Sequence, residues 1–163
     1  MTTRITAGAV LASLLLLSTV HAADDPTLVS LATCQESWTD WKQDPGRGRT
    51  FRIKFESEFR AQDREPFYLP IRPTTLLGQP VTRIYPDSVG MGVGFSVVAS
   101  ASFEAVKASM ERHMGKPFDR CEVAEGAKSC ERKLAKDRTV VLMEAGRGNN
   151  PQTLFGCYYF YAP

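Results

Sequence analysis

Apolar residues in the C-terminal half of the chain alternate as β-strands require, and one helical pattern interrupts them. Residues 91–101 have the pattern of a strand, and Ser102 begins an amphipathic helix that Gly115 ends. Further strands are expected at about 118–123, 129–135, 138–145 and 154–161. Their links are too short for crossovers, so they must be antiparallel neighbours. The predicted class is α+β: a curved antiparallel sheet of four to five strands with one helix packed on its face.

The N-terminal half adds a helical segment to this sheet. Leu28, Leu31 and Trp38 recur at helical spacing, so one helix is expected over residues 28–42 with its Leu and Trp face buried. The proline and glycines of residues 44–48 are expected to end that helix.

Residues 51–60 fit two patterns. Their phenylalanines alternate as in a strand, and they also repeat every four residues as on one face of a helix. We favour the helix, because opposite charges stand four residues apart along the segment. Residues 65–90 are rich in proline, which predicts extended, loop-like chain with one short strand at 81–85.

The first 22 residues have the pattern of a signal peptide. Arg4 precedes a short apolar run from Ala7 to Val20, and Ala22 fits the residue before a signal-peptidase cut. An uncleaved membrane anchor is the alternative, but the run is shorter than the roughly 20 residues that a spanning helix needs. We expect residues 23–163 to form a single exported domain, periplasmic or secreted, without stable membrane insertion after cleavage.

Four cysteines, Cys34, Cys121, Cys130 and Cys157, lie in the predicted mature chain and allow three pairings. Cys121 and Cys130 flank a Glu-Gly turn, so a bridge across that hairpin is the simplest pairing, and it leaves Cys34 with Cys157. A zinc site is the alternative. The cysteines lack the paired C-x-x-C spacing of such sites, and an exported chain favours oxidation, so we expect two disulfides and no metal.

Composition and motifs argue against several classes of function. The formal net charge of +2 is no footprint for nucleic-acid binding. The chain contains no Walker A, H-E-x-x-H or EF-hand pattern, so no cofactor is expected. His113 is the one histidine after the leader, and its place in a helix's last turn favours contact with the terminal carbonyls over catalysis. No catalytic residue is assigned.

Two polar features are candidate binding surfaces. Basic residues outnumber acidic ones between Lys42 and Arg83, which suits an acidic protein partner, although a solvated surface is the simpler interpretation. Residues 146–153 form a polar hairpin tip that suits insertion into a partner's cleft, although it also fits a plain surface turn. The candidate binding residues are Arg147, Asn149, Asn150, Arg47, Arg49 and Arg72.

Several stretches resemble small exported proteins of Gram-negative bacteria. They are LATCQESWTDW, YPDSVGMGVGFSV, RTVVLME and GCYYFY. Some of these proteins resemble periplasmic immunity proteins, which protect a cell from toxic effectors delivered by its kin. The resemblance implies a protein partner, a secreted toxin or hydrolase, and it assigns no functional residue.

Two classes of function follow. The first is an immunity or inhibitor protein that binds and neutralises a toxic effector enzyme. The alternative is an envelope glycan or cell-wall hydrolase with a carboxylate pair drawn from Glu56, Glu58, Asp63 and Glu65. A structural or ligand-binding envelope module is a third possibility, in which the aromatic strand Tyr158–Tyr161 lines a pocket.

Overall fold

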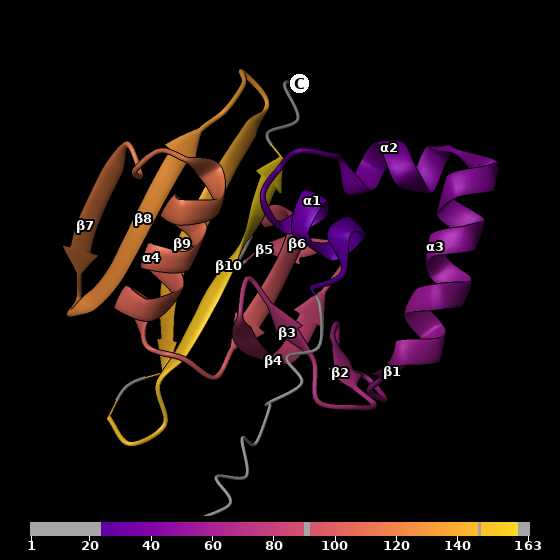
Figure 1. Ribbon diagram of the computed structural model, residues 1–163, viewed down its shortest axis with the longest axis horizontal. Helices are drawn as coiled ribbons and strands as arrows, with labels where there is room; N and C mark the ends of the chain where they lie inside the picture. Colours follow the sequence, from indigo (N-terminus) through magenta and orange to yellow (C-terminus); the bar gives the residue numbers. More distant parts are fainter. Residues whose placement is uncertain (1–23, 90–91, 147, 160–163) are drawn as a thin grey trace, which may run out of the picture.

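The computed structural model describes residues 24–89, 92–146 and 148–159, so the expected leader lies outside the described ranges. Within them the chain forms four helices and ten strands (Figure 1). The helices are α1 (Pro26–Ala32), α2 (Trp38–Gln43), α3 (Pro45–Glu58) and α4 (Phe103–Met114). The strands are β1 (Phe59–Ala61), β2 (Tyr68–Pro70), β3 (Thr75–Leu76), β4 (Gln79–Tyr85), β5 (Ser88–Val89), β6 (Gly92–Ala99), β7 (Arg120–Ala124), β8 (Ala127–Lys133), β9 (Arg138–Gly146) and β10 (Gln152–Tyr159).

The strands pair antiparallel throughout the described part of the chain. Their continuous order is β1-β2-β4-β6-β10-β9-β8-β7, while β3 pairs beside β4 and β5 beside β6. The expected sheet of four to five strands with one helix is therefore wrong: ten strands pair, and four helices form. Strands of two or three residues, such as β2 and β3, are too short to show an alternating pattern. Both lie in the proline-rich stretch, residues 65–90, for which the sequence predicts loop-like chain.

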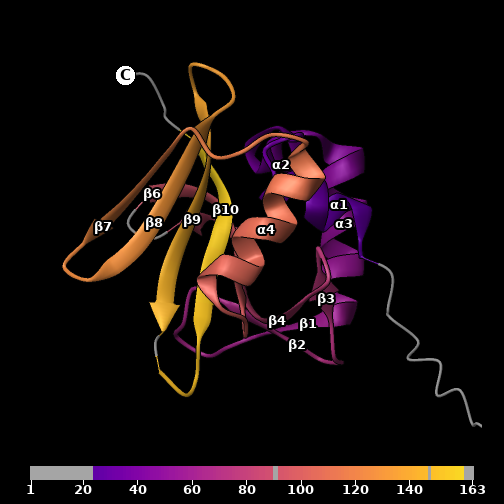
Figure 2. The same cartoon turned by 60° about the vertical axis from the view of Figure 1, so that its left-hand side comes forward.

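The core lies between the central strands and the helices on one side of them. Figure 2 shows α1 and α4 on the same side of β6, β9 and β10. Phe95 of β6, Phe155 of β10 and Leu142 of β9 are fully buried, and Leu31 of α1 and Met110 of α4 are buried in the same cluster. The opposite face of β7, β8 and β9 carries no helix in these views.

The single helix expected over residues 28–42 is wrong, because Cys34 divides it. Cys34 adopts the left-handed backbone conformation, with φ of 59°. A left-handed residue ends a helix, and glycine usually occupies such a position. The chain then starts α2 afresh, where the Ser37 hydroxyl accepts a hydrogen bond from the backbone N–H of Asp40. Trp38 consequently lies at the start of α2, half-buried, rather than on a buried helical face.

Residues 44–48 do not break the helical region as expected; they begin α3. The Asp44 carboxylate accepts hydrogen bonds from the backbone N–H groups of Gly46 and Arg47, both at 2.9 Å, and Pro45 occupies the first helical position. The helix favoured over residues 51–60 is confirmed as far as Glu58, after which β1 begins.

Phenylalanines spaced four residues apart fasten α3 to its neighbours. The rings of Phe51 and Phe55 stack with centroids 5.4 Å apart, and those of Phe55 and Phe59 with centroids 4.8 Å apart. Trp38 of α2 meets Phe51 edge-on at 5.1 Å, and Tyr68 of β2 meets Phe55 at 4.8 Å. This aromatic column joins α2, α3 and β2, and each ring pair adds about 0.5–1.5 kcal/mol beyond its buried area.

Both expected disulfides are confirmed. Cys34 at the end of α1 is joined to Cys157 of β10, across 123 positions of sequence. Cys121 and Cys130 face each other directly in the β7–β8 ladder, with Cα atoms 4.1 Å apart. Two disulfides fit a protein of an oxidising compartment. None of the helices in the described ranges has both the length and the apolar character needed to span a bilayer.

Removal of the long-range disulfide should destabilise the chain more than removal of the hairpin disulfide. A Cys34→Ala/Cys157→Ala variant should lose about 4–5 kcal/mol of unfolding free energy, against about 2–3 kcal/mol for Cys121→Ala/Cys130→Ala, because the closed loop is longer. Urea denaturation of the two double variants measures the difference. Equal losses would mean that loop entropy does not set the contribution of these bridges.

Gly156 of β10 should not tolerate a side chain. A Cβ atom at this position would lie 2.2 Å from the carbonyl oxygen of Phe95 and 2.6 Å from the Cα atom of Ser96, both backbone atoms of β6. We expect Gly156→Ala to cost at least about 2 kcal/mol of unfolding free energy, because the two strands must separate. Gly46→Ala is the control: its Cβ would meet Asp44 Oδ1 at an ordinary 3.4 Å, and the variant should fold as well as the wild type. Similar melting curves for both would contradict the clash.

Candidate functional site

The corner between α2 and α3 encloses a surface hollow with a basic lining, which we call the basic groove. Its volume is about 360 Å³. Figure 1 shows α2 leading directly into α3 at this corner. The groove is lined by Trp38, Lys42, Asp44, Pro45, Gly48, Arg49 and Arg52.

Two local features of the sequence form the corner. Asp44 lies between the two helices and is at once the C-cap of α2 and the N-cap of α3, so no loop separates them. Gly48 allows the close approach of the two helices, because a Cβ at this position would lie 2.3 Å from the carbonyl oxygen of Trp41. Arg49 and Arg52, three residues apart and therefore neighbours on the helix surface, line the groove together with Trp38 and Lys42 of α2.

The positive charges of the groove are unevenly compensated. Lys42 Nζ lies 2.6 Å from Asp87, whose carboxylate also accepts a hydrogen bond from the Trp38 indole at 2.9 Å. Arg52 lies 3.9 Å from Glu56, the outer limit of an ion pair. Among the described residues, Arg49 has no acidic partner. The groove therefore offers a guanidinium group beside an indole ring, an arrangement that suits a carboxylate from outside the chain.

The candidate binding residues predicted from the sequence lie on different surfaces of the structure. Arg47 does not line the groove: its guanidinium lies 4.6 Å from the centre of the Trp41 ring and pairs with Glu36 at 2.5 Å. Arg72 lies on a different hollow, of about 480 Å³, with Ser57 and Glu58 among its lining residues. Of the candidate arginines that the structure describes, only Arg49 therefore lines the basic groove.

The loop between β9 and β10 lies apart from these arginines. In both Figure 1 and Figure 2 it protrudes at the end of the β9–β10 hairpin, away from α3. Asn149 and Asn150 are exposed on it, and Arg147 lies outside the described residues. The loop and the basic groove are consequently separate candidate surfaces.

The carboxylates considered for hydrolysis are solvated. Glu56, Glu58, Asp63 and Glu65 are all exposed. A carboxyl group that acts as a general acid usually lies in a buried, apolar setting, and none of these four side chains does. No cluster of three or more His, Cys, Asp or Glu residues with metal-site geometry occurs within the described ranges.

The other candidate side chains have structural surroundings. Tyr159 is buried, and its hydroxyl accepts a hydrogen bond from the backbone N–H of Trp38 at 2.9 Å. Tyr158 is half-buried on β10, and residues 160–161 of the expected aromatic strand lie outside the described residues. His113 is exposed, and its Nε2 lies 3.1 Å from the side-chain amide of Gln35. This contact differs from the expected one with the carbonyls at the end of α4.

Three side chains outside the basic groove have pKa values shifted from their ordinary values. A hydrogen bond from Lys107 lowers the pKa of Glu111, which also accepts from the backbone N–H of Phe118. Hydrogen bonds to Asp25 and Glu104 raise the pKa values of Lys54 and Lys128, respectively. The Lys54–Asp25 and Lys128–Glu104 pairs join two elements, whereas the Lys107–Glu111 pair lies within α4, and each shift is explained by its ion pair.

Comparisons with protein-family models, curated proteins and solved structures found no match to this chain. The basic groove is therefore assessed on its own chemistry. Of the residues that line the groove, the sequence predicted only Arg49 as a binding residue. Trp38 was expected in the core, and Lys42 and Arg52 were not among the candidate binding residues. The signal available was Asp-Pro at 44–45, a helix start that would have placed these residues around one corner.

His113 should be dispensable for folding. His113→Ala removes one exposed hydrogen bond, so the free energy of unfolding should fall by no more than about 1 kcal/mol. Met110→Ala on the same helix is the contrast, since its fully buried side chain should cost about 2–5 kcal/mol. Urea denaturation of both variants measures the two losses. A loss at His113 as large as at Met110 would assign the histidine a structural role that its exposure does not explain.

Proposed function

We propose that this chain is a periplasmic immunity or inhibitor protein, which binds a toxic effector enzyme and neutralises it. The observation that carries the proposal is the basic groove, which Arg49 and Trp38 both line and in which Arg49 has no acidic partner among the described residues. The export leader, the two disulfides and the resemblance to small exported proteins support the same compartment and class.

Inhibition would require only binding. Hydrolase active sites commonly present carboxylates, and a guanidinium can hold a carboxylate through two parallel hydrogen bonds. Arg49 and Arg52 lie one helical turn apart, so they can grip an acidic segment at two points. The aromatic column behind α3 holds these arginines on a rigid helix, which lowers the entropy lost on binding.

The hydrolase alternative has less support. Its four carboxylates are exposed on α3 and on the chain after β1, where nothing desolvates them. No observation in the described residues favours a ligand-binding module over an inhibitor either, since Tyr159 is occupied in the core.

A charge reversal at Arg49 should abolish protection. Deletion of the gene should make cells sensitive to wild-type kin in co-culture, and the wild-type gene should restore survival. We expect Arg49→Glu to weaken binding of the toxin by at least about 30-fold, the factor that corresponds to a hot-spot loss of about 2 kcal/mol, and to fail in protection. Calorimetric titration of the toxin identified by co-culture genetics measures this factor.

Arg60→Glu is the matched control, since it makes the same charge change at an exposed residue of β1 outside the groove. It should protect fully, and both variants should melt like the wild type because exposed substitutions rarely cost more than about 0.5 kcal/mol. Arg147→Ala tests the β9–β10 loop in the same assay. Survival of the deletion strain would refute the immunity function, whereas protection by Arg49→Glu with failure of Arg147→Ala would move the interface to the loop.

A further inference from the structure

The strand β7 forms an open edge of the sheet. It is the last strand in the sheet order and pairs with β8 alone among the described strands. All five of its residues are exposed, and the Val123 side chain is 68% exposed. Figures 1 and 2 place β7 at the opposite side of the molecule from α3, so this edge is separate from the basic groove.

The edge is held in a fixed shape. A two-residue turn, Glu125 and Gly126 with φ of 51° and 77°, joins β7 to β8. Such a turn matches the twist of a hairpin. The disulfide between Cys121 and Cys130 then closes the hairpin covalently, one pair from the end of the ladder that lies away from the turn. A partner would meet a preformed strand and would not bear the cost of ordering it.

The register shows which backbone groups of β7 lack a β8 partner. In an antiparallel ladder, opposed residues alternate between hydrogen-bonded pairs, with Cα atoms about 5.5 Å apart, and non-hydrogen-bonded pairs at about 4.5 Å. The Cα separation of 4.1 Å between Cys121 and Cys130 places them in the second kind. Cys121 and, two residues on, Val123 therefore direct their N–H and C=O groups outward, away from β8.

β7 has few of the features that usually prevent an edge strand from pairing with another chain. Proteins blunt free edges with proline, lysine, bulges or very short strands. β7 contains no proline or lysine, and its register with β8 runs without a shift from Arg120 to Ala124. Its charges are Arg120 and Glu122, which select a complementary strand rather than block every strand.

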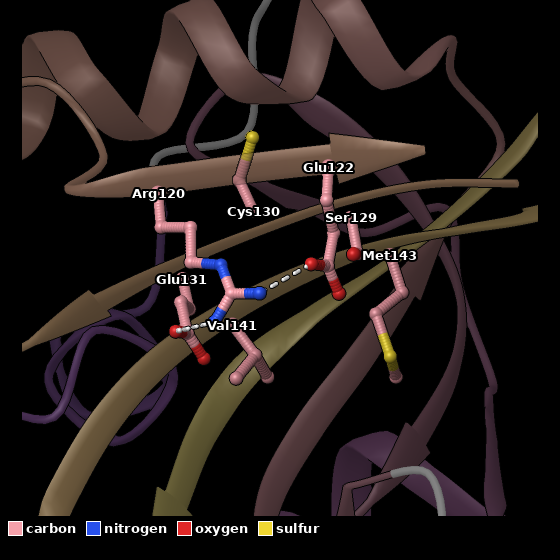
Figure 3. Close-up of a pocket in the computed structure, with 7 residues that line it drawn as sticks. All are labelled: Arg120, Glu122, Ser129, Cys130, Glu131, Val141 and Met143. Atoms are coloured by element: carbon pink, nitrogen blue, oxygen red, sulfur yellow. Dashed lines mark hydrogen bonds and ion pairs between the residues drawn. The ribbon is translucent and has the colours of Figure 1, made fainter. Parts of the chain in front are cut away.

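The two faces beside β7 differ in chemistry. On the face without helices, Arg120 lies 2.8 Å from Glu122 and 3.9 Å from Glu131, around a hollow of about 140 Å³ (Figure 3). Figure 3 also shows Cys130 pointing the other way, toward the helix side. On that side a second hollow, of about 280 Å³, is lined in part by Val123 and by Phe103 of α4.

We propose that β7 is a docking edge for an extended segment of another polypeptide, which joins the sheet as an antiparallel strand. Hydrogen bonds to the outward backbone groups of Cys121 and Val123 would hold the segment. Its side chains would alternate: a basic residue opposite Glu122 and an acidic one opposite Arg120 on the open face, with an apolar residue opposite Val123 beside Phe103. Read from its N-terminus, the segment has the pattern apolar–basic–apolar–acidic.

A second copy of this chain fits the edge poorly. The register that uses all the outward groups of Cys121 and Val123 would set Glu122 of one copy opposite Glu122 of the other. Like charges directly opposite in a ladder are destabilising. The partner is therefore a different polypeptide with the complementary charge order, and this surface extends the proposed function without depending on it.

The test uses the disulfide-bonded mature chain and two synthetic peptides that differ in charge order. The matched peptide is acetyl-Thr-Val-Lys-Val-Glu-Thr-amide, and the control exchanges its Lys and Glu. Nuclear magnetic resonance titration to about 1 mM peptide, a range that detects weak binding, should shift the amide signals of Cys121 and Val123. We expect the matched peptide to bind about tenfold more tightly than the control, because two cross-strand charge pairs change sign.

Three variants of the protein sharpen the test. Arg120→Glu/Glu122→Lys/Glu131→Lys keeps both contacts of position 120, reverses their polarity and should reverse the peptide preference. Val123→Pro removes one outward N–H and should reduce affinity for both peptides at least tenfold, whereas Val123→Thr keeps the N–H and should bind normally. The proposal is overturned by an absence of shifts at β7, by equal affinity for the two peptides, or by concentration-dependent shifts at β7 without peptide, which would assign the edge to a second copy.

Discussion

The bond between Cys34 and Cys157 is the constraint on which the rest of the structure depends. It joins the end of α1 to β10, the strand that lies between β6 and β9 in the sheet. Cys34 reaches this bond in a left-handed conformation that a non-glycine residue adopts at a cost of about 1–2 kcal/mol. The backbone N–H groups of Cys34 and Gln35 donate to the carbonyls of Leu31 and Ser30, which closes the end of α1, and the covalent link fixes this turn against the sheet. The chain enters α2 from this fixed point, and the corner at Asp44 follows at the end of that short helix.

This dependence also explains which parts of the fold the sequence predicted. The helix from Ser102 to Gly115 was predicted because its cap, amphipathic face and left-handed glycine are all local signals. The two disulfides were predicted from a hairpin turn and elimination. The division of residues 28–42 was not predicted, because cysteine, unlike glycine, does not signal a left-handed helix end. Backbone hydrogen bonds from Cys34 to Leu31 and from Gln35 to Ser30 nevertheless close α1 there. The extent of the sheet was missed for a related reason: strands as short as β3 exist through pairing with a neighbour and carry no pattern of their own.

The candidate site, like the fold, was predictable only where local sequence signals determine it. Charge counting predicted that the arginines of α3 lie on a surface, but it could not separate Arg47 from Arg49. The first is occupied by Trp41 and Glu36, while the second lines the groove. That distinction depends on the sharp corner at Asp44 and on the space that Gly48 leaves for α2. Local contacts thus engage Arg47, whereas Arg49, two positions on, has no acidic partner among the described residues.

The placement of the two disulfides suits a protein that acts by binding. One bridge holds the helical segment that carries the basic groove, and the other holds the hairpin whose outer strand is β7. The two surfaces lie on opposite sides of the molecule (Figure 1). Because the two surfaces share no residue and lie far apart, the acidic segment proposed for the basic groove and the strand proposed for β7 would bind independently, and substitutions on one surface should leave binding at the other unchanged.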